Sequence, residues 1–161
     1  MSLKEDINFS LWCDFIERDF LETRFKEIIK KNIIQGATSN PAIFESSITN
    51  SLAYKQQLDM LQANNAKTIY EELALTDIKR AAALLSDLHK NDADDGFISI
   101  EVDPLLCDDA AGTIEEGVRL YSMISADNVM IKIPATEAGY IAMRELTSKG
   151  INVNATLIFS P

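Results

Sequence analysis

The chain has 161 residues, a length typical of one domain, so we expect residues 1–161 to share a single core. Asp and Glu number 25 against 15 Lys and Arg, and this net charge of -10 disfavours nucleic acid or an anionic membrane as a partner, although a local positive site can still bind a phosphate group. Hydrophobic residues make up 47% of the chain and charged residues 25%, values that exclude disorder and collagen-like repeats.

Short apolar segments alternate with longer stretches of helical periodicity, the pattern of βαβ units in a parallel sheet. Strands are expected near 11–15, 36–40, 97–103, 128–134 and 151–159. Between the first two strands, apolar residues recur at helical spacing from Phe20 to Ile29, and Gly36 follows as a stop signal. The pair Asn40-Pro41 predicts the N-cap and first residue of the next helix.

The long interval from 41 to 95 is expected to hold two or three helices. Within it, Thr76-Asp77 predicts an N-cap, because an apolar stripe from Ile78 to Leu88 follows at helical spacing. The last helix is expected over 137–149, with Gly150 as the residue that ends it.

Side chains of alternating polarity indicate the kind of sheet. An open doubly wound sheet is covered by helices on both faces, so its central strands are apolar throughout, whereas a (β/α)8 barrel is covered only outside. Here each of the last three strands has one apolar and one polar face, which favours a TIM-type barrel, and no GxGxxG or GxxxxGK[ST] motif occurs. The inward polar positions, expected to converge in one cavity, are Asp14, Thr38, Asn40, Glu101, Lys132, Asn154 and Thr156.

Lys132 lies in a strand between residues that bury. A buried ammonium ion is costly, so a lysine so placed tends to lose its proton and become a nucleophile. With Asp14 and Glu101 to move protons, the pattern indicates Schiff-base chemistry on a carbonyl substrate. A purely structural ion pair between Lys132 and Glu101 on neighbouring strands explains the same pattern equally well.

The cysteines and the single histidine narrow the possible sites and mechanisms. Cys13 and Cys107 lack CxxC spacing, which argues against a disulfide framework or a cysteine zinc site and favours a reducing, cytoplasmic location. A single histidine, His89, excludes mechanisms that need two. The N-terminus lacks the features of a signal peptide, and no stretch approaches the roughly 20 apolar residues of a membrane span.

Four segments, in order and spacing, resemble the signature segments of the transaldolase family, and the likeness runs from about Leu11 to the last residue. The segments are GATSNPAIF at 36–44, SIEVDP at 99–104, NVMIKIPAT at 128–136 and GINVNATLIFS at 150–160. The resemblance implies an enzyme of the non-oxidative pentose phosphate pathway that needs no metal or organic cofactor. It implies transfer of a dihydroxyacetone unit from sedoheptulose 7-phosphate to glyceraldehyde 3-phosphate.

The resemblance also implies roles for the inward residues. Lys132 matches the Schiff-base lysine, and Glu101 the carboxylate that moves protons through a water held by Thr156. Asp14 matches the acid/base that takes the proton from the C4 hydroxyl as the C3–C4 bond breaks. The residues that match side chains around the dihydroxyacetone unit are Asn40, Asn154 and Thr38.

The length departs from the family pattern. At about 35 residues per unit, eight units need roughly 280 residues, so we expect only strands one to five and their helices, the N-terminal part of a barrel. The family's phosphate-binding basic residues are then expected beyond Pro161. Two alternatives stay open. One is a catalytically incomplete association module that closes its edges by self-association or by pairing with the missing C-terminal part. The other is a related fructose 6-phosphate aldolase-type lyase.

Overall fold

The computed structural model describes residues 3–159, which form a sheet whose strand order follows the chain, β1-β2-β3-β4-β5. The strands are Trp12–Cys13 (β1), Gly36–Thr38 (β2), Phe97–Glu101 (β3), Val129–Pro134 (β4) and Val153–Thr156 (β5). β1 pairs with β2, and β4 with β5, in parallel. A doubly wound sheet reverses its strand order at a switch point and this one does not, which agrees with part of a (β/α) barrel.

Each predicted strand contains an observed one, and the observed strands are shorter. The chain divides into two compact units, Met1–Ile98 and Ser99–Pro161, and the division falls within β3. The expectation of a single domain therefore stays a prediction, and the two units are described one after the other.

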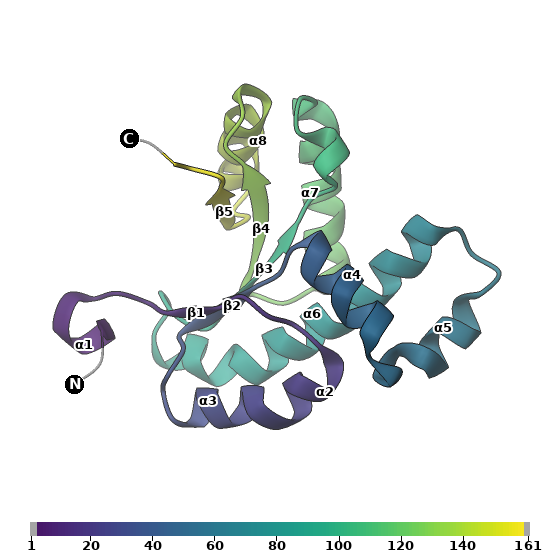
Figure 1. Cartoon of the computed structure of the whole chain (residues 1–161). Helices are drawn as coiled ribbons and strands as arrows, with labels where there is room; N and C mark the ends of the chain where they lie inside the picture. Colours follow the sequence, from purple (N-terminus) through teal and green to yellow (C-terminus); the bar gives the residue numbers. More distant parts are fainter. Residues whose placement is uncertain (1–2, 160–161) are drawn as a thin grey trace. The chain divides into compact units, whose positions relative to one another are not determined.

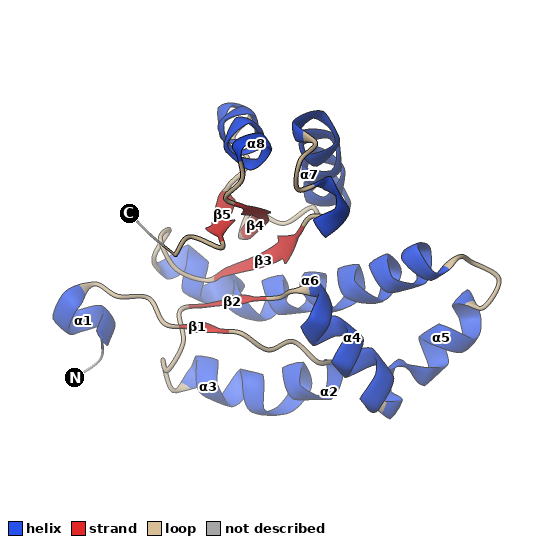
Figure 2. Cartoon of the chain, turned by 45° about the horizontal axis from the view of Figure 1, so that its top comes forward, coloured by secondary structure: helices blue, strands red, loops and turns tan. Residues whose placement is uncertain are grey.

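In the first unit, a helix follows β1 as predicted (Figure 2). The predicted stop signal at Gly36 is wrong, because the helix ends at Lys30 and Gly36 is the first residue of β2. The helix has three consecutive segments. They are α2 (Arg18–Phe20), the π-turn η1 (Leu21–Phe25) and α3 (Lys26–Lys30). A short helix, α1 (Leu3–Ile7), precedes β1. Leu21 and Phe25 face the core and are 1% and 0% exposed, because they recur at the spacing that puts one face of a helix inward.

The helices between β2 and β3 are α4 (Pro41–Asn50), the 3-10 turn η2 (Leu52–Tyr54), α5 (Lys55–Leu61) and α6 (Ala66–Asn91). The predicted cap is confirmed, since the Ile43 amide donates to Asn40 Oδ1 over 2.9 Å. The predicted N-cap at Thr76-Asp77 is wrong, because α6 runs through both residues and is capped by Asn65. Thr76 instead donates to the Glu72 carbonyl one turn earlier, and Asp77 is buried in the interior of the unit.

In the second unit, β3 leads through the 3-10 turn η3 (Pro104–Leu106) to α7 (Ala110–Ile124), and β4 leads to α8 (Glu137–Ser148). The two helices lie side by side next to β4 (Figure 1). They pack closely because Leu146 lies over Gly117, where a Cβ atom would come within 2.7 Å of the leucine side chain. The predicted end of the last helix is confirmed, since Gly150 follows it with a φ of +78°.

Candidate active site

Lys132 and Glu101 come together on neighbouring strands of the second unit. Lys132 lies in β4 and Glu101 is the last residue of β3, and Nζ lies 3.3 Å from Oε2. Their side chains are only 11% and 16% exposed. The flanking residues Ile131 and Ile133 are fully buried, which confirms the alternation expected from the sequence. The pair is therefore a charge contact that is largely, but not completely, removed from solvent.

β5 adds Asn154 to this pair. Asn154 is the register partner of Lys132, and its Nδ2 donates to Ser99 Oγ over 3.1 Å. Ser99 is fully buried and lies two residues before Glu101, so alternation puts both on the same face of β3. Thr156 is partly exposed, two residues beyond Asn154, and pairs with Pro134 in the register. Three adjacent strands thus present polar side chains on one face.

Ser99 was not among the site residues predicted from the sequence, although it was on the predicted polar face. The signal that could have found it is its spacing of two from Glu101 on one strand. The spacing does not predict the hydrogen-bond partner of Ser99, because Asn154 lies 55 positions away in the sequence. A buried hydroxyl that accepts from an amide fixes which way that amide points.

Hydrogen bonds also fasten the loops that follow the two charged residues. After β3, the Asp103 amide donates to Glu116 Oε1 on α7 over 2.7 Å. After β4, Thr136 donates to the Cys107 carbonyl over 2.6 Å and accepts from the Gly139 amide over 2.9 Å, which caps α8. These hydrogen bonds hold the backbone that follows Lys132 and Glu101, and so help to fix the positions of the two side chains.

The other three predicted residues belong to the first unit. Thr38 ends β2 and is partly exposed, and Asn40, two residues on, uses its Oδ1 to cap α4. Asp14 directly follows β1 and is exposed to solvent. All three lie at or just beyond the carboxyl end of a strand, the end where barrel enzymes carry their active sites. Their convergence with Lys132 in one cavity stays a prediction.

Cys13, beside Asp14, has the character of a packed thiol. Burial raises the pKa of this thiol, and its Sγ donates to the Phe15 carbonyl over 3.5 Å. Cys107 is also a free thiol. Within residues 3–159, no cluster of three His, Cys, Asp or Glu side chains is arranged to hold a metal ion. In the same part of the chain, no helix combines the length and the apolar character needed to cross a membrane.

Comparison with known proteins decides the family. The model of the transaldolase/fructose-6-phosphate aldolase family matches residues 11–161. The chain belongs to this family. It is 52% identical over 153 residues to a transaldolase of Helicobacter pylori (strain ATCC 700392 / 26695), an alignment that covers 95% of this chain and 48% of that protein.

A transaldolase of Campylobacter jejuni (serotype O:23/36, strain 81-176) is similar as well. It is 56% identical over 155 residues, which cover 95% of this chain and 46% of the relative. The chain thus spans about half the length of the curated relatives that it matches. The resemblance found in the four signature segments is confirmed, and so is the assignment to a family of (β/α) barrel transaldolases and aldolases.

Proposed function

We propose that this protein acts as a transaldolase of the non-oxidative pentose phosphate pathway. It transfers a dihydroxyacetone unit from sedoheptulose 7-phosphate to glyceraldehyde 3-phosphate through a Schiff base on Lys132. The observation that carries the proposal is the contact of 3.3 Å between Lys132 Nζ and Glu101 Oε2 in a member of this family. A primary amine beside a carboxylate, both largely shielded from water, is equipped to condense with a ketone.

The proposed reaction begins when the Lys132 amine attacks the ketose carbonyl carbon and forms a carbinolamine. Glu101, through a water held by Thr156, delivers the proton that lets the hydroxyl leave as water, and an iminium ion results. Asp14 then takes the proton of the C4 hydroxyl, the C3–C4 bond breaks, and its electron pair moves into the iminium. The aldose leaves, and the three-carbon enamine stays bound to Lys132.

Transfer follows because the three-carbon unit is retained covalently. The enamine carbon attacks the aldehyde of the acceptor, the same groups return the protons, and hydrolysis of the imine frees Lys132. Asn154, Asn40 and Thr38 serve as hydrogen-bonding partners of the substrate hydroxyls. Asn154 is the best supported of the three, since it lies beside Lys132 in the register and its amide is fixed by Ser99.

Borohydride trapping tests this proposal. The protein is incubated with fructose 6-phosphate and sodium borohydride, and the modified peptide is identified by mass spectrometry. We expect a reduced dihydroxyacetone adduct on Lys132 and none in Lys132→Arg, which keeps the positive charge beside Glu101 but cannot form the imine at pH 7. An adduct on another lysine, or its persistence in Lys132→Arg, would refute the proposal.

Two proteins are used in this test, because the chain spans about half the length of its relatives. One is the 161-residue chain. The other, which we call the hybrid, joins this chain to the part of the Campylobacter jejuni transaldolase that the alignment does not cover. Sugar phosphates need a positive site, and the hybrid supplies the basic residues expected beyond Pro161. We expect little or no turnover from the chain alone and transaldolase activity from the hybrid.

Two alternatives are judged in the same assays. A fructose 6-phosphate aldolase-type lyase would release free dihydroxyacetone, whereas a transaldolase forms a new ketose phosphate only when an aldose phosphate acceptor is added. An association module is favoured by apolar side chains that are exposed on α8 and in the segment after β5, among them Tyr140, Leu157 and Phe159 at 53%, 60% and 90%. Size-exclusion mass tests it, since a monomer of the 161-residue chain counts against self-association. A cytoplasmic location stays a prediction.

A further inference from the structure

The segment that follows Asp14 is held from several sides by elements of the first unit. Only Phe15 separates Asp14 from Ile16, whose carbonyl accepts a hydrogen bond from Ser47 Oγ of α4 over 2.9 Å in a buried position. Two residues later, the Arg18 amide donates to the Tyr54 hydroxyl over 3.2 Å. On the other side of Asp14, Cys13 pairs with β2. Asp14 therefore lies on a short span fixed at both ends.

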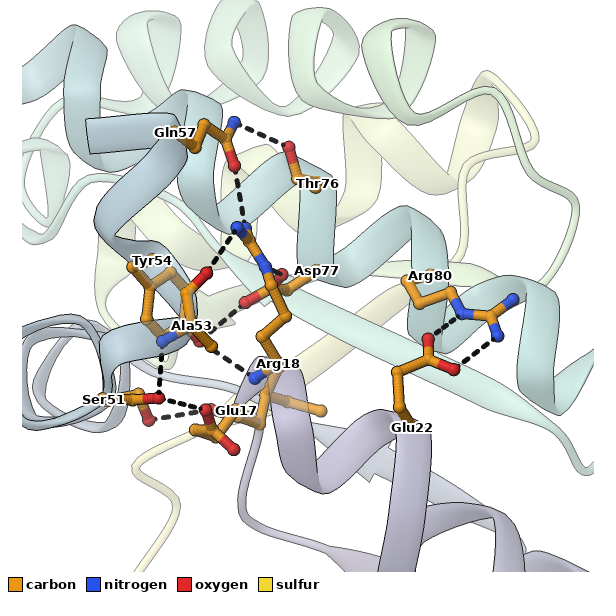
Figure 3. A network of polar contacts seen from close by, with 12 residues as sticks. Glu17, Arg18, Glu22, Ser51, Ala53, Tyr54, Gln57, Thr76, Asp77 and Arg80 are labelled. Atoms are coloured by element: carbon orange, nitrogen blue, oxygen red, sulfur yellow. Dashed lines mark hydrogen bonds and ion pairs between the residues drawn. The ribbon is translucent and has the colours of Figure 1, made fainter. Parts of the chain in front are cut away.

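Arg18 is the centre of the contacts on the helical side (Figure 3). Its Nε donates to Asp77 Oδ1 over 2.9 Å, and its Nη2 donates to Gln57 Oε1 over 2.8 Å. Its guanidinium also stacks on the Tyr54 ring, with Cζ 4.6 Å from the ring centroid. The Tyr54 hydroxyl closes the cluster by donating to Asp77 Oδ2 over 2.7 Å. One arginine thus joins α2 to η2, α5 and α6.

Burying the Asp77 carboxylate in this cluster costs free energy, because the charge is removed from water. Its side chain is 2% exposed in the middle of a helix, and burial raises its pKa as well as that of Tyr54. A buried ion pair of this kind adds little stability beyond what apolar residues of the same size would add. It does require one arrangement of its partners, because any other arrangement leaves a buried charge or hydroxyl unpaired.

A second contact supports the same segment. Glu17 accepts from the Phe20 amide over 2.7 Å and so caps α2, and its other oxygen accepts from Ser51 Oγ over 2.7 Å. Glu17 and Arg18 therefore bind the start of α2 to the turn between α4 and α5 through both backbone and side chains (Figure 3). The same contacts fix the backbone that begins two residues after the exposed carboxylate of Asp14.

We propose that Arg18, Tyr54 and Asp77 form a positioning cluster for Asp14, one that holds the β1–α2 segment so that the Asp14 carboxylate is aimed for proton transfer when the C3–C4 bond breaks. The three residues act through the backbone from Ile16 to Arg18 and do not touch the substrate. The proposal rests on the proposed function, in which Asp14 acts when the C–C bond breaks or forms, and Lys132 with Glu101 forms the imine. Weakening the cluster should therefore slow cleavage and leave imine formation intact.

Tyr54→Phe is the main variant, because it removes one hydroxyl, and with it the contacts to Asp77 and the Arg18 amide, while the ring stays. Asp77→Asn is the second variant, in case the first does not fold. Glu22→Gln is the matched control: it breaks the exposed pair of Glu22 with Arg80, which also joins the helix after β1 to α6 (Figure 3). The control thus removes a link from the helix after β1 to α6 that involves neither Tyr54 nor residues 15–18.

The first readout is borohydride trapping of the hybrid with fructose 6-phosphate. Before cleavage, reduction leaves a six-carbon phosphate adduct on Lys132, and after cleavage it leaves the three-carbon dihydroxyacetone adduct. We expect the ratio of six-carbon to three-carbon adduct to rise about tenfold to a hundredfold in Tyr54→Phe, the effect of misplacing a catalytic group by about 1 Å. Total adduct is expected to stay within about twofold of the wild type, and Glu22→Gln to leave both quantities unchanged.

The second readout is amide hydrogen exchange of the 161-residue chain, which does not depend on activity. We expect residues 15–18 to exchange at least about tenfold faster in Tyr54→Phe, with β4 and α8 unchanged, because only the local contacts are weakened. An adduct ratio unchanged in both variants, or exchange equal to that of Glu22→Gln, would overturn the proposal. If the wild-type hybrid traps no adduct on Lys132, the proposed function and the role of Asp14 fail together, and exchange alone then decides whether the cluster holds the segment.

Discussion

Replacing Lys132 by Met tests what the contact with Glu101 is for. Met keeps an unbranched stem of similar length but leaves the Glu101 carboxylate without the charge that lies 3.3 Å away. Removal of one partner from a buried ion pair costs about 3–5 kcal/mol, because the remaining charge stays in a medium of low polarity. The side chains are 11% and 16% exposed, so some water reaches them and we expect the lower end, about 3 kcal/mol.

The double variant Lys132→Met/Glu101→Gln separates the pair's two possible roles. With both charges removed, no carboxylate is left unpaired, and we expect the free energy of unfolding to return to within about 1 kcal/mol of the wild type. The assay is urea denaturation of the 161-residue chain followed by far-UV circular dichroism, since the single tryptophan, Trp12, lies in the first unit and reports on the wrong half. At about 2–4 °C per kcal/mol, Lys132→Met should also lower the Tm by about 6–12 °C.

The outcome decides between the two interpretations of Lys132 that its sequence pattern leaves open. If the double variant is as stable as the wild type, the charges are not needed for the fold, and their presence is explained by chemistry. Equal stability of Lys132→Met and the wild type would refute the reasoning, because it would mean that the unpaired Glu101 carboxylate carries no cost. A double variant no more stable than Lys132→Met would show that the pair itself stabilises the second unit.

Three further predictions concern the framework of the two units. Leu146→Ala should lower the free energy of unfolding by about 3 kcal/mol, since this side chain of α8 is fully buried against Gly117 of α7. A loss below about 1 kcal/mol would mean that the helices close the cavity. Gly139→Ala should prevent the second unit from folding, because the added Cβ would lie 2.0 Å from the Pro134 carbonyl oxygen. Gly150→Asn should keep the Tm close to that of the wild type, because no atom lies within 4 Å of an added Cβ there and Asn accepts a positive φ. Arg80, and then Lys26, lower the pKa of Glu22 to about 2, so the stabilisation from this carboxylate is complete above its ordinary pKa of 4.5 and is lost as the pH falls toward 2. Glu22→Gln should therefore remove part of the fall in Tm between pH 5 and pH 3. Salt at 1 M should weaken this effect, because the Glu22 side chain is 44% exposed. Identical dependence of the Tm on pH in the wild type and in Glu22→Gln would contradict the assignment.

Local patterns predicted the strands and two of the helix ends correctly. The strand around Lys132 was identified because Val129, Ile131 and Ile133 alternate with polar positions, and a period of two depends only on neighbouring residues. The cap at Asn40 and the helix end at Gly150 were predicted for the same reason, since each acts on backbone groups within a few residues. The contact of Lys132 with Glu101 followed once the two strands were taken as neighbours.

The same local reasoning was wrong at Asp77. An acidic residue before an apolar stripe has the pattern of a helix start, and that pattern is identical whether the carboxylate caps a helix or is buried inside the fold. The difference is made by Arg18 and Tyr54, which are 59 and 23 positions away and bring the donors that a buried carboxylate needs. The bond between Ser99 and Asn154 was missed for the same reason.

By itself, then, the sequence determined where the strands and two of the helix ends lie, that the sheet is parallel with polar residues on one face, and which family the chain belongs to. These properties depend on spacing along the chain and on short ordered motifs. Only the tertiary structure decided that Asp77 accepts hydrogen bonds from Arg18 and Tyr54 and that Ser99 accepts one from Asn154 beside Lys132. Both are hydrogen bonds between distant residues, and their partners become defined only when packing brings the elements together.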